Sequence, residues 1–377
     1  MRGNVTKRGA NSWRIKFDLE SDAKGKRQTR YVTVKGTRKD AERELTRLLG
    51  TANNGTFVEA NQSTIGEHVR NWLDGAHGLS GRTVERYREL AEAQIIPHIG
   101  AMLIQKLKPV HVQQWHATLL ARGGKDGAAL GGRTVGHCHR LLHRILASAV
   151  RAELVARNVA SVISPPKVAE AEIEILKADQ IGVVTAALAD HWLQPIVMLA
   201  LATGMRRGEI LALRWGAIDL DKAGVKVERS LEQTKAGLKF KAPKTRTSKR
   251  VVSLPPTAVE ALREHRRRQL ETRLALGQGR PDSDTLVFSN IEGNPIPPVN
   301  FSRDWARFVK ARKLSPVSFH ALRHTHVSAL IARGVDVLTI SRRIGHANAA
   351  ITLRVYGHMF EQNDSAAVNA IEAALHG

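Results

Sequence analysis

Residues 319–325 read FHALRHT and residues 202–209 read ATGMRRGE, and these two stretches decide how the C-terminal half of the chain is interpreted. Three shorter blocks accompany them: APKT at 242–245, IGH at 344–346 and YGH at 356–358. A single His-x-x-Arg spacing is weak evidence, because it also occurs at His137/Arg140 and at His265/Arg268. The order of all five blocks is therefore the informative feature.

Together the five blocks resemble those of the tyrosine recombinase, or phage integrase, family. The resemblance extends from about residue 64 to the C-terminus and implies an enzyme that cuts and rejoins DNA through a 3′-phosphotyrosine intermediate. It also implies that Glu209 helps to hold the active-site arginines. Matched block by block, it assigns the catalytic residues as Arg206, Lys244, His320, Arg323, His346 and Tyr356.

These residue types suit phosphodiester chemistry that needs no metal ion. Attack on a phosphodiester concentrates negative charge on the non-bridging oxygens, and two permanently charged, planar guanidiniums can stabilise that charge. A phenol with a pKa of about 10 is a feasible nucleophile and a good leaving group for the reverse step. Under the resemblance, Lys244 is the general acid, His320 the general base and His346 a donor to a phosphate oxygen. No cofactor and no metal site are expected.

Two of these assignments depend on local context. The chain has three tyrosines; Tyr31 falls in an expected strand and Tyr87 in an expected helix, so Tyr356 is the predicted nucleophile. The alternative is a tyrosine that merely covers a C-terminal helix. Lys244 has four other lysines close to it between residues 235 and 249, and its position within APKT favours it over them.

The charge balance indicates a polyanionic partner. The 377 residues include 58 Lys and Arg against 35 Asp and Glu, a net charge of +23, and cationic side chains gain affinity for a phosphate backbone by releasing its counterions. The single cysteine, Cys138, excludes a disulfide framework and a cysteine-based zinc site. No export signal or membrane-spanning stretch is evident, so we expect a cytoplasmic protein, associated with the nucleoid of a bacterial host cell.

An arm-type DNA-binding module is predicted for residues 1–58, which hold 14 Lys and Arg against six Asp and Glu. Alternation over 13–19 and 31–34 indicates two strands joined by a turn at 22–27. The capping pattern of Thr37 with Asp40 indicates a helix that ends before Gly50. The segment resembles the small three-stranded arm-binding domain of phage and mobile-element integrases. Its expected basic strand face carries Arg14, Lys16, Arg27 and Arg30.

After a linker at 51–63, residues 64–165 are expected to form an all-helical core-site DNA-binding domain. Helical patterns cover 65–73, 81–96, 109–120 and 132–151. The last of these carries Arg140 and Arg144 on a cationic face that we expect to contact DNA; the alternative is an ordinary solvated face. His137, Cys138, His139 and His143 share this helix, but adjacent helical residues point in different directions, which argues against a metal site.

After a second linker at 167–174, residues 175–377 are expected to form the catalytic domain. Helices are indicated at 178–188, 193–202, 209–213 and 257–276, and short strands at 225–227, 251–254 and 286–288. The chain is thus predicted to be multidomain. It combines a small N-terminal β-sheet-plus-helix module, an all-α core-binding domain and a helix-rich α+β tyrosine-recombinase catalytic domain.

The predicted function is that of a site-specific DNA recombinase, the integrase of a phage or integrative mobile element, acting through a Holliday junction. Its expected partners are double-stranded DNA attachment sites, further copies of the chain in a homotetramer on DNA, DNA-bending accessory proteins and an excision factor. Three alternatives stay open. They are a resolvase-type recombinase acting on replicon dimers, which usually lacks an arm module, a type IB topoisomerase, which acts without site specificity, and a DNA-binding protein that is not an enzyme.

Overall fold

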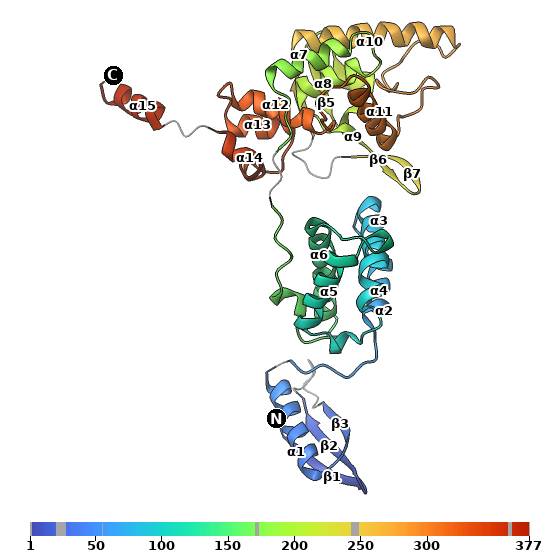
Figure 1. The fold of residues 1–377 in the computed structure, drawn as a ribbon, viewed down its shortest axis with the longest axis vertical. Coiled ribbons are helices and arrows are strands. Elements are labelled where there is room, and N and C mark those ends of the chain that lie inside the picture. The colour runs from blue at the N-terminus through green and yellow to red at the C-terminus, as the bar shows by residue number, and fades with distance from the viewer. Residues whose placement is uncertain are drawn as a thin grey trace. The chain divides into compact units, whose positions relative to one another are not determined.

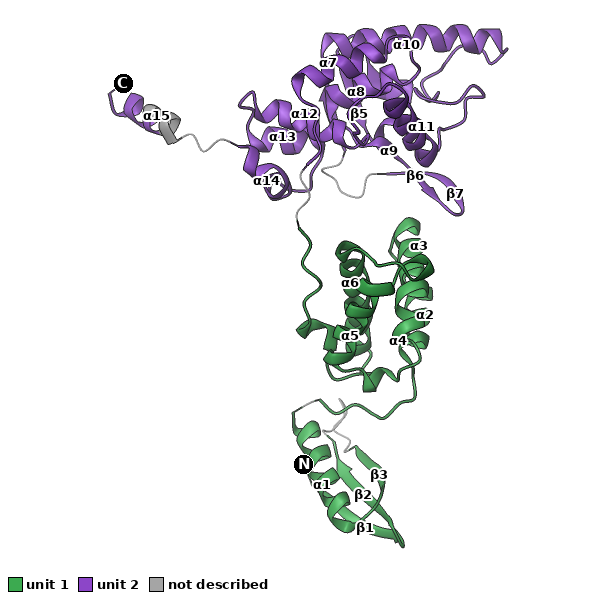
Figure 2. Cartoon of the chain, viewed as in Figure 1, with its two compact units in different colours: residues 1–169 green, residues 170–377 purple. Residues whose placement is uncertain are grey.

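The computed structural model describes residues 2–19, 28–54, 56–169, 173–242, 249–360 and 364–376. The chain divides into two compact units, residues 1–169 and residues 170–377 (Figure 2). The boundary between them falls inside the segment 167–174, which the sequence indicates as a linker. None of the described helices is both long and apolar enough to cross a membrane.

A three-stranded antiparallel sheet begins the first unit. The strands β1 (Gly3–Gly9), β2 (Ser12–Asp18) and β3 (Thr29–Lys35) pair in chain order, and α1 (Arg38–Asn53) packs on one face (Figure 1). Ile15 and Phe17 of β2 are buried in a small core with Leu48 of α1. The two predicted strands are confirmed. The alternation pattern missed β1 because this edge strand is exposed along most of its length and contributes only Val5 to the core.

Thr37 forms the predicted capping box at the start of α1. Its hydroxyl accepts a hydrogen bond from the Asp40 backbone N–H, and the Asp40 carboxylate accepts one from the Thr37 N–H at 2.9 Å. The prediction that the helix ends before Gly50 is wrong, since α1 continues to Asn53. Ala52 is buried in that last turn, and such packing offsets the cost of about 1 kcal/mol for a glycine inside a helix.

The rest of the first unit is helical and has its own hydrophobic core, which includes Trp115, Leu142 and Ile145. A π-helical stretch, Ala91–Ile95, interrupts the helix expected at 81–96 just before Pro97. Proline has no N–H to donate to the preceding turn, and a wider π turn accommodates that loss. The helices are α2 (Ile65–Asp74), α3 (Gly81–Leu90), α4 (Ile96–Ile99), α5 (Pro109–Arg122) and α6 (Gly132–Arg151).

The second unit is built around α8 (Gln194–Thr203). This helix contacts α7 (Ala178–Ala187), α9 (Arg207–Ile210), α10 (Pro256–Ala275) and α12 (Ala321–Ile331) (Figure 1). The hydrophobic core of the second unit includes Ile196, Leu199, Leu262 and Leu322, together with Trp305 of α11 (Pro298–Ala311). The remaining helices are α13 (Val337–Ile344), α14 (Ala349–Tyr356) and α15 (Asp364–His376).

Two small antiparallel sheets accompany these helices. The first has the strand order β4 (Ile218–Asp219), β5 (Gly224–Val227), β8 (Arg250–Ser253), and the second is a hairpin of β6 (Ser230–Thr234) and β7 (Gly237–Lys241). The strand expected at 286–288 is absent from the described structure, where Leu286 makes only an isolated bridge to Arg214. Its apolar run marks burial instead, since Leu286, Val287 and Phe288 all lie in the interior. The helix expected at 209–213 is a single turn at Arg207–Ile210.

Candidate active site

A left-handed glycine turns the chain into the site. α8 ends at Thr203, and Gly204 follows it with φ of 63°. A side chain here would also have no room, because a Cβ on Gly204 would lie 2.6 Å from the His326 ring. The turn exposes the Gly204 carbonyl to α12 and delivers Arg206 to the start of α9.

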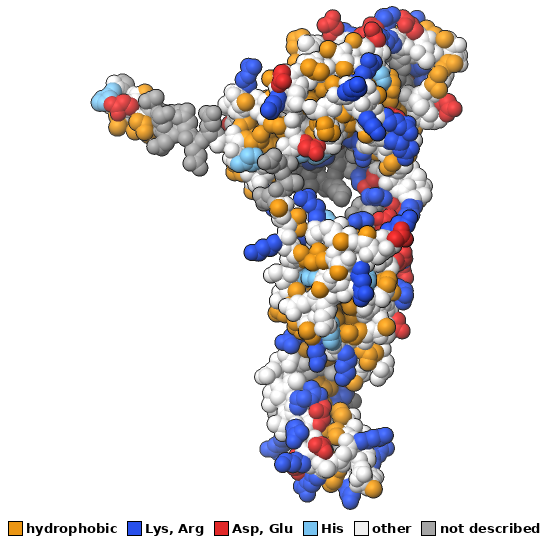
Figure 3. All heavy atoms as spheres, viewed as in Figure 1, with side chains coloured by type: hydrophobic (Ala, Val, Ile, Leu, Met, Phe, Trp, Pro, Cys, Tyr) orange, Lys and Arg blue, Asp and Glu red, His pale blue; other side chains and the backbone are white. Residues whose placement is uncertain are grey.

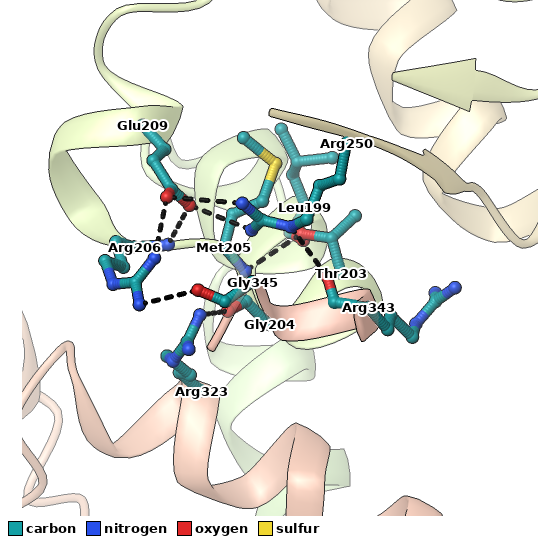
Figure 4. Close-up of polar contacts among 10 residues, drawn as sticks. All are labelled: Leu199, Thr203, Gly204, Met205, Arg206, Glu209, Arg250, Arg323, Arg343 and Gly345. Carbon is teal, nitrogen blue, oxygen red and sulfur yellow. Dashed lines mark hydrogen bonds and ion pairs between the residues drawn. The ribbon is translucent and has the colours of Figure 1, made fainter. Parts of the chain in front are cut away.

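Glu209 is the buried anchor of the cluster shown in Figure 4. Its side chain is 4% exposed, and its carboxylate accepts hydrogen bonds from Arg206 Nη1 at 3.0 Å and from Arg250 Nη2 at 2.9 Å. It also accepts the Arg206 backbone N–H at 2.9 Å. Burial alone would raise the pKa of this carboxyl, but the hydrogen bond and charge of Arg250, followed by those of Arg206, outweigh it and hold the pKa of Glu209 below its usual value.

We expect Glu209→Gln to destabilise the second unit by about 3–5 kcal/mol, because the change leaves two cations around a buried neutral group. Thermal and urea unfolding would measure this. The contribution of Glu209 should be fully present above its unfolded pKa of 4.5 and be lost as pH falls through its lower folded value. The variant should therefore lose less stability than the wild type on acidification.

Glu264→Gln is the matched control for that change. Glu264 lies on the surface of α10 and pairs with Arg267 and Arg268, where solvent screens the interaction. Its replacement should leave the unfolding transition nearly unchanged. An equal effect of the two substitutions would contradict the anchoring role of Glu209.

Arginines from distant parts of the chain fasten this cluster together. Arg206 Nη2 donates to the Gly345 carbonyl at 3.1 Å, and Arg250 Nε donates to the Arg343 carbonyl at 2.7 Å. Arg343 in turn donates to the carbonyls of Ala202 and Ser253. The start of α9, strand β8 and the end of α13 are thus held in one frame around Glu209.

Arg323 presents a nitrogen that is ready for a ligand. The residue is 3% exposed, and its Nη1 donates to the Gly204 carbonyl at 2.6 Å. Within the described part of the chain, its buried Nη2 has no hydrogen-bond partner. Burial, and then the positive charge of Arg206, lowers the pKa of Arg323 to about 9, so the group still carries its charge at neutral pH. An unpaired buried donor of this kind calls for an acceptor.

The two predicted site histidines lie beside these arginines and are neutral at pH 7. Partial burial, followed by the charges of His324, Arg323 and Arg206, lowers the pKa of His320 to about 4, although the residue reaches the surface. The His346 pKa falls to about 4 through burial and then the charges of Arg323 and Arg206. His346 Nδ1 lies 2.9 Å from the Thr352 hydroxyl, which fixes the ring.

Tyr356 ends α14 and is 1% exposed. Its ring packs in a cluster with Val327, Ile340 and Ile344. Burial raises the pKa of its hydroxyl to about 12, against the opposing charge of Arg323. The hydroxyl lies 2.6 Å from His324 Nδ1, a contact that was not predicted.

The second unit therefore brings Arg206, His320, Arg323, His346 and Tyr356 into one interacting group. Lys244 lies outside the described residues. The sequence interpretation gave no role to Arg250, Arg343 or His324. His324 stands inside the FHALRHT block, one helical turn after His320, and that spacing was the available signal.

The predicted DNA-contacting residues of the N-terminal module do not share one face. Arg14 and Lys16 are exposed on β2, on the face opposite buried Ile15 and Phe17. Arg30 pairs in register with Phe17, so its side chain lies on the other face and forms an ion pair with Glu59. The prediction of a shared strand face is therefore wrong for Arg30, because alternation reverses sides at each residue. Arg27 lies outside the described residues.

The predicted cationic residues of α6 are exposed. Arg140 Nη2 lies 3.0 Å from His137 Nδ1, and Arg144 Nη1 donates to the Tyr87 hydroxyl at 3.2 Å. Lys and Arg side chains are also numerous on the face of the N-terminal module that Figure 3 shows. Among the described residues, no group of three or more His, Cys, Asp or Glu is placed to hold a metal ion.

Two family models match this chain: the phage integrase family over residues 172–363 and the N-terminal SAM-like domain of phage integrases over residues 64–120. An integrase of Streptomyces ambofaciens is 30% identical, over 91% of this chain and 88% of that protein. A protein named tyrosine recombinase XerC-like, from Caldanaerobacter subterraneus subsp. tengcongensis, is 28% identical over 98% of this chain and 97% of that protein. The chain belongs to the phage integrase family, and it is a tyrosine recombinase.

Solved structures support the same fold. The Tn1549 transposon integrase in complex with transposon right end DNA matches with a TM-score of 0.68 at 18% identity, over 82% of this chain and 99% of that one. A lambda integrase tetramer bound to a Holliday junction matches with a TM-score of 0.57 at 16% identity, over 92% of this chain and 94% of that one.

Proposed function

We propose that this recombinase is the integrase of a phage or integrative mobile element, which cuts and rejoins DNA at specific sites through a 3′-phosphotyrosine. The observation that carries the proposal is the position of Arg323 next to both Arg206 and the buried Tyr356, with Arg323 Nη2 left without a partner among the described residues. Such a set of donors suits one scissile phosphate. Two guanidiniums neutralise the charge that develops on its non-bridging oxygens.

In this mechanism the Tyr356 hydroxyl gives its proton to a histidine base as its oxygen attacks the phosphorus, and the bond to the 5′-oxygen breaks. Lys244 protonates the departing 5′-oxygen, and His346 donates to a phosphate oxygen. The ligation step reverses these events, with tyrosinate as the leaving group, so that the bond energy is conserved and no nucleotide cofactor is consumed. Since Tyr356 is 1% exposed, the side chains that cover its hydroxyl must move aside before DNA reaches it.

The remaining parts of the chain are assigned to DNA binding. The cationic residues of α6, Arg140 and Arg144, are proposed to contact the core site, and Arg14 and Lys16 of β2 the arm site. The structural relative assembled as a tetramer on a Holliday junction supports a homotetramer that exchanges strands in sequence. Accessory proteins that bend DNA, and an excision factor, would set the direction of the reaction.

The test uses DNA taken from both sides of the gene, because an integrated element lies beside its own attachment site. A nicked duplex from this DNA should trap a covalent adduct with the chain, and sequencing of the trapped ends should place the cleavage at one position. Adducts scattered over unrelated plasmid DNA, with relaxation of its supercoils, would indicate a topoisomerase instead. A complete lack of adducts would refute the proposed activity.

A resolvase-type recombinase is the second candidate, because it would use the same chemistry at the same site; the module at residues 1–58 is the feature that would distinguish an integrase from it. Removing residues 1–60 separates the two functions. We expect the shortened chain to form the adduct on a nicked core site, since every described catalytic residue lies in the second unit, but to lose recombination between full attachment sites. A recombination assay measures this. Undiminished recombination by the shortened chain would favour the resolvase.

A further inference from the structure

His324 is the side chain that contacts the nucleophile. It lies on α12, half-buried, with its Nδ1 2.6 Å from the Tyr356 hydroxyl and its ring tilted by 56° against the tyrosine ring. A distance of 2.6 Å is at the short end for such a hydrogen bond. The tyrosine hydroxyl therefore lies within hydrogen-bonding distance of a ring nitrogen that can act as a base.

His320, the general base that the family resemblance implies, has a different position. Among the described residues, no hydrogen bond joins it to Tyr356; its ring meets the edge of the His324 ring at a centroid distance of 4.9 Å. It is exposed, whereas Tyr356 is buried. This position suits contact with the incoming phosphate better than removal of the tyrosine proton.

The surroundings of His324 favour the neutral form of its ring. Burial, followed by the positive charge of Arg323, lowers the pKa of His324, while the negative charge of Glu174 opposes them. A neutral imidazole accepts at one nitrogen only, so His324 can accept the tyrosine proton at Nδ1 in the tautomer that carries its own proton on Nε2. The Tyr356 pKa of about 12 means that the phenol keeps its proton until an acceptor takes it.

We propose that His324 is a catalytic residue, the base that takes the Tyr356 proton during DNA cleavage and returns it during ligation. As the tyrosine oxygen forms its bond to phosphorus, the O–H proton moves to His324 Nδ1, and the bond from phosphorus to the 5′-oxygen breaks, with the 5′-oxygen protonated by the general acid. In the reverse step the 5′-hydroxyl attacks the phosphorus and returns its proton to the general acid. The bond from phosphorus to the tyrosine oxygen breaks, and His324 gives that oxygen its proton back. The inference rests on the proposed function, since it deepens the mechanism of the same site.

The substitution that tests this is His324→Asn. An asparagine oxygen can occupy the place of Nδ1 and still accept the tyrosine hydrogen bond, but it cannot bind the proton at neutral pH. We expect adduct formation on the nicked flanking-DNA duplex to slow by about 100-fold, the scale of general base catalysis. DNA binding in gel shifts and the melting temperature should stay at wild-type values. His98→Asn, an exposed histidine of the first unit, is the control for the substitution itself.

A more acidic nucleophile separates a catalytic role of His324 from a structural one, because it should restore the cleavage rate only if the variant lacks a base. A fluorinated tyrosine, placed at position 356 by codon suppression, has a lower pKa and needs less help from a base. It should restore much of the lost rate in His324→Asn, and it should do so less in His320→Asn. Wild-type cleavage by His324→Asn, or a defect that the fluorinated tyrosine leaves unchanged, would overturn the assignment. If the wild-type chain forms no adduct, the proposed function itself fails and the assignment falls with it.

Discussion

Replacing Tyr356 by phenylalanine is expected to abolish the covalent protein–DNA adduct while leaving DNA binding intact. The ring of phenylalanine still fills the cluster around Val327, Ile340 and Ile344, and the change deletes only the oxygen that His324 contacts. Loss of one such hydrogen bond alters the free energy of unfolding by about 1 kcal/mol. Loss of the nucleophile lowers the rate by a factor on the order of 10⁶, as in other enzymes that form covalent intermediates.

Denaturing gels of the nicked flanking-DNA duplex measure the adduct, and gel shifts measure binding. Tyr87→Phe is the matched control, because it also removes one hydroxyl with a single polar contact, in this case to Arg144. The control should form the adduct at the wild-type rate. An adduct formed by the Tyr356→Phe chain, or an adduct mapped to another side chain by mass spectrometry, would refute the assigned nucleophile.

Local pattern was sufficient to predict much of the fold. The α6 boundaries, Gly132 to Arg151, agree with the expectation because a strong apolar stripe ends where the chain exposes polar residues. Patterns failed where the deciding contact comes from outside the segment. β1 depends on pairing with β2, the final turn of α1 depends on the burial of Ala52, and the apolar run at 286–288 is buried without being a strand.

The candidate site shows the same division. Five of the six predicted catalytic residues lie together in the second unit. They could be predicted because each belongs to a block whose order along the chain could be recognised. The roles of Arg250 and Arg343 could not be predicted, because their partners are distant in the sequence. Arg250 contacts Glu209, 41 residues away along the chain, and Arg343 contacts Ala202, 141 residues away. Arg30 lies on the face opposite the predicted one. Its position opposite Phe17 is fixed by the pairing of β2 with β3, which the charge of Arg30 does not reveal.

Arg323→Lys is expected to reduce the rate of DNA cleavage by about 10²–10³-fold, the cost of losing one fixed donor to a developing negative charge. The guanidinium holds the Gly204 carbonyl with Nη1 and leaves Nη2 for the phosphate. A lysine has one nitrogen at the end of a flexible chain, so it cannot keep the Gly204 contact and present a second donor in a fixed direction. Arg307→Lys is the control, since Arg307 is a surface residue of α11 that pairs only weakly with Asp304.

A modified substrate can show why the cleavage rate of Arg323→Lys is reduced. The cause is either the loss of charge stabilisation at the phosphate or a disturbance of the hydrogen bonds around Glu209. In a methylphosphonate duplex, a methyl group replaces one non-bridging oxygen, so that little negative charge develops there and the missing donor matters less. The ratio of wild-type to Arg323→Lys rates should therefore shrink on this substrate. A distorted site would be slow on both substrates, and its melting temperature would fall as in the Glu209→Gln chain. A ratio that stays constant between the two substrates would contradict the role of Arg323 as a phosphate ligand.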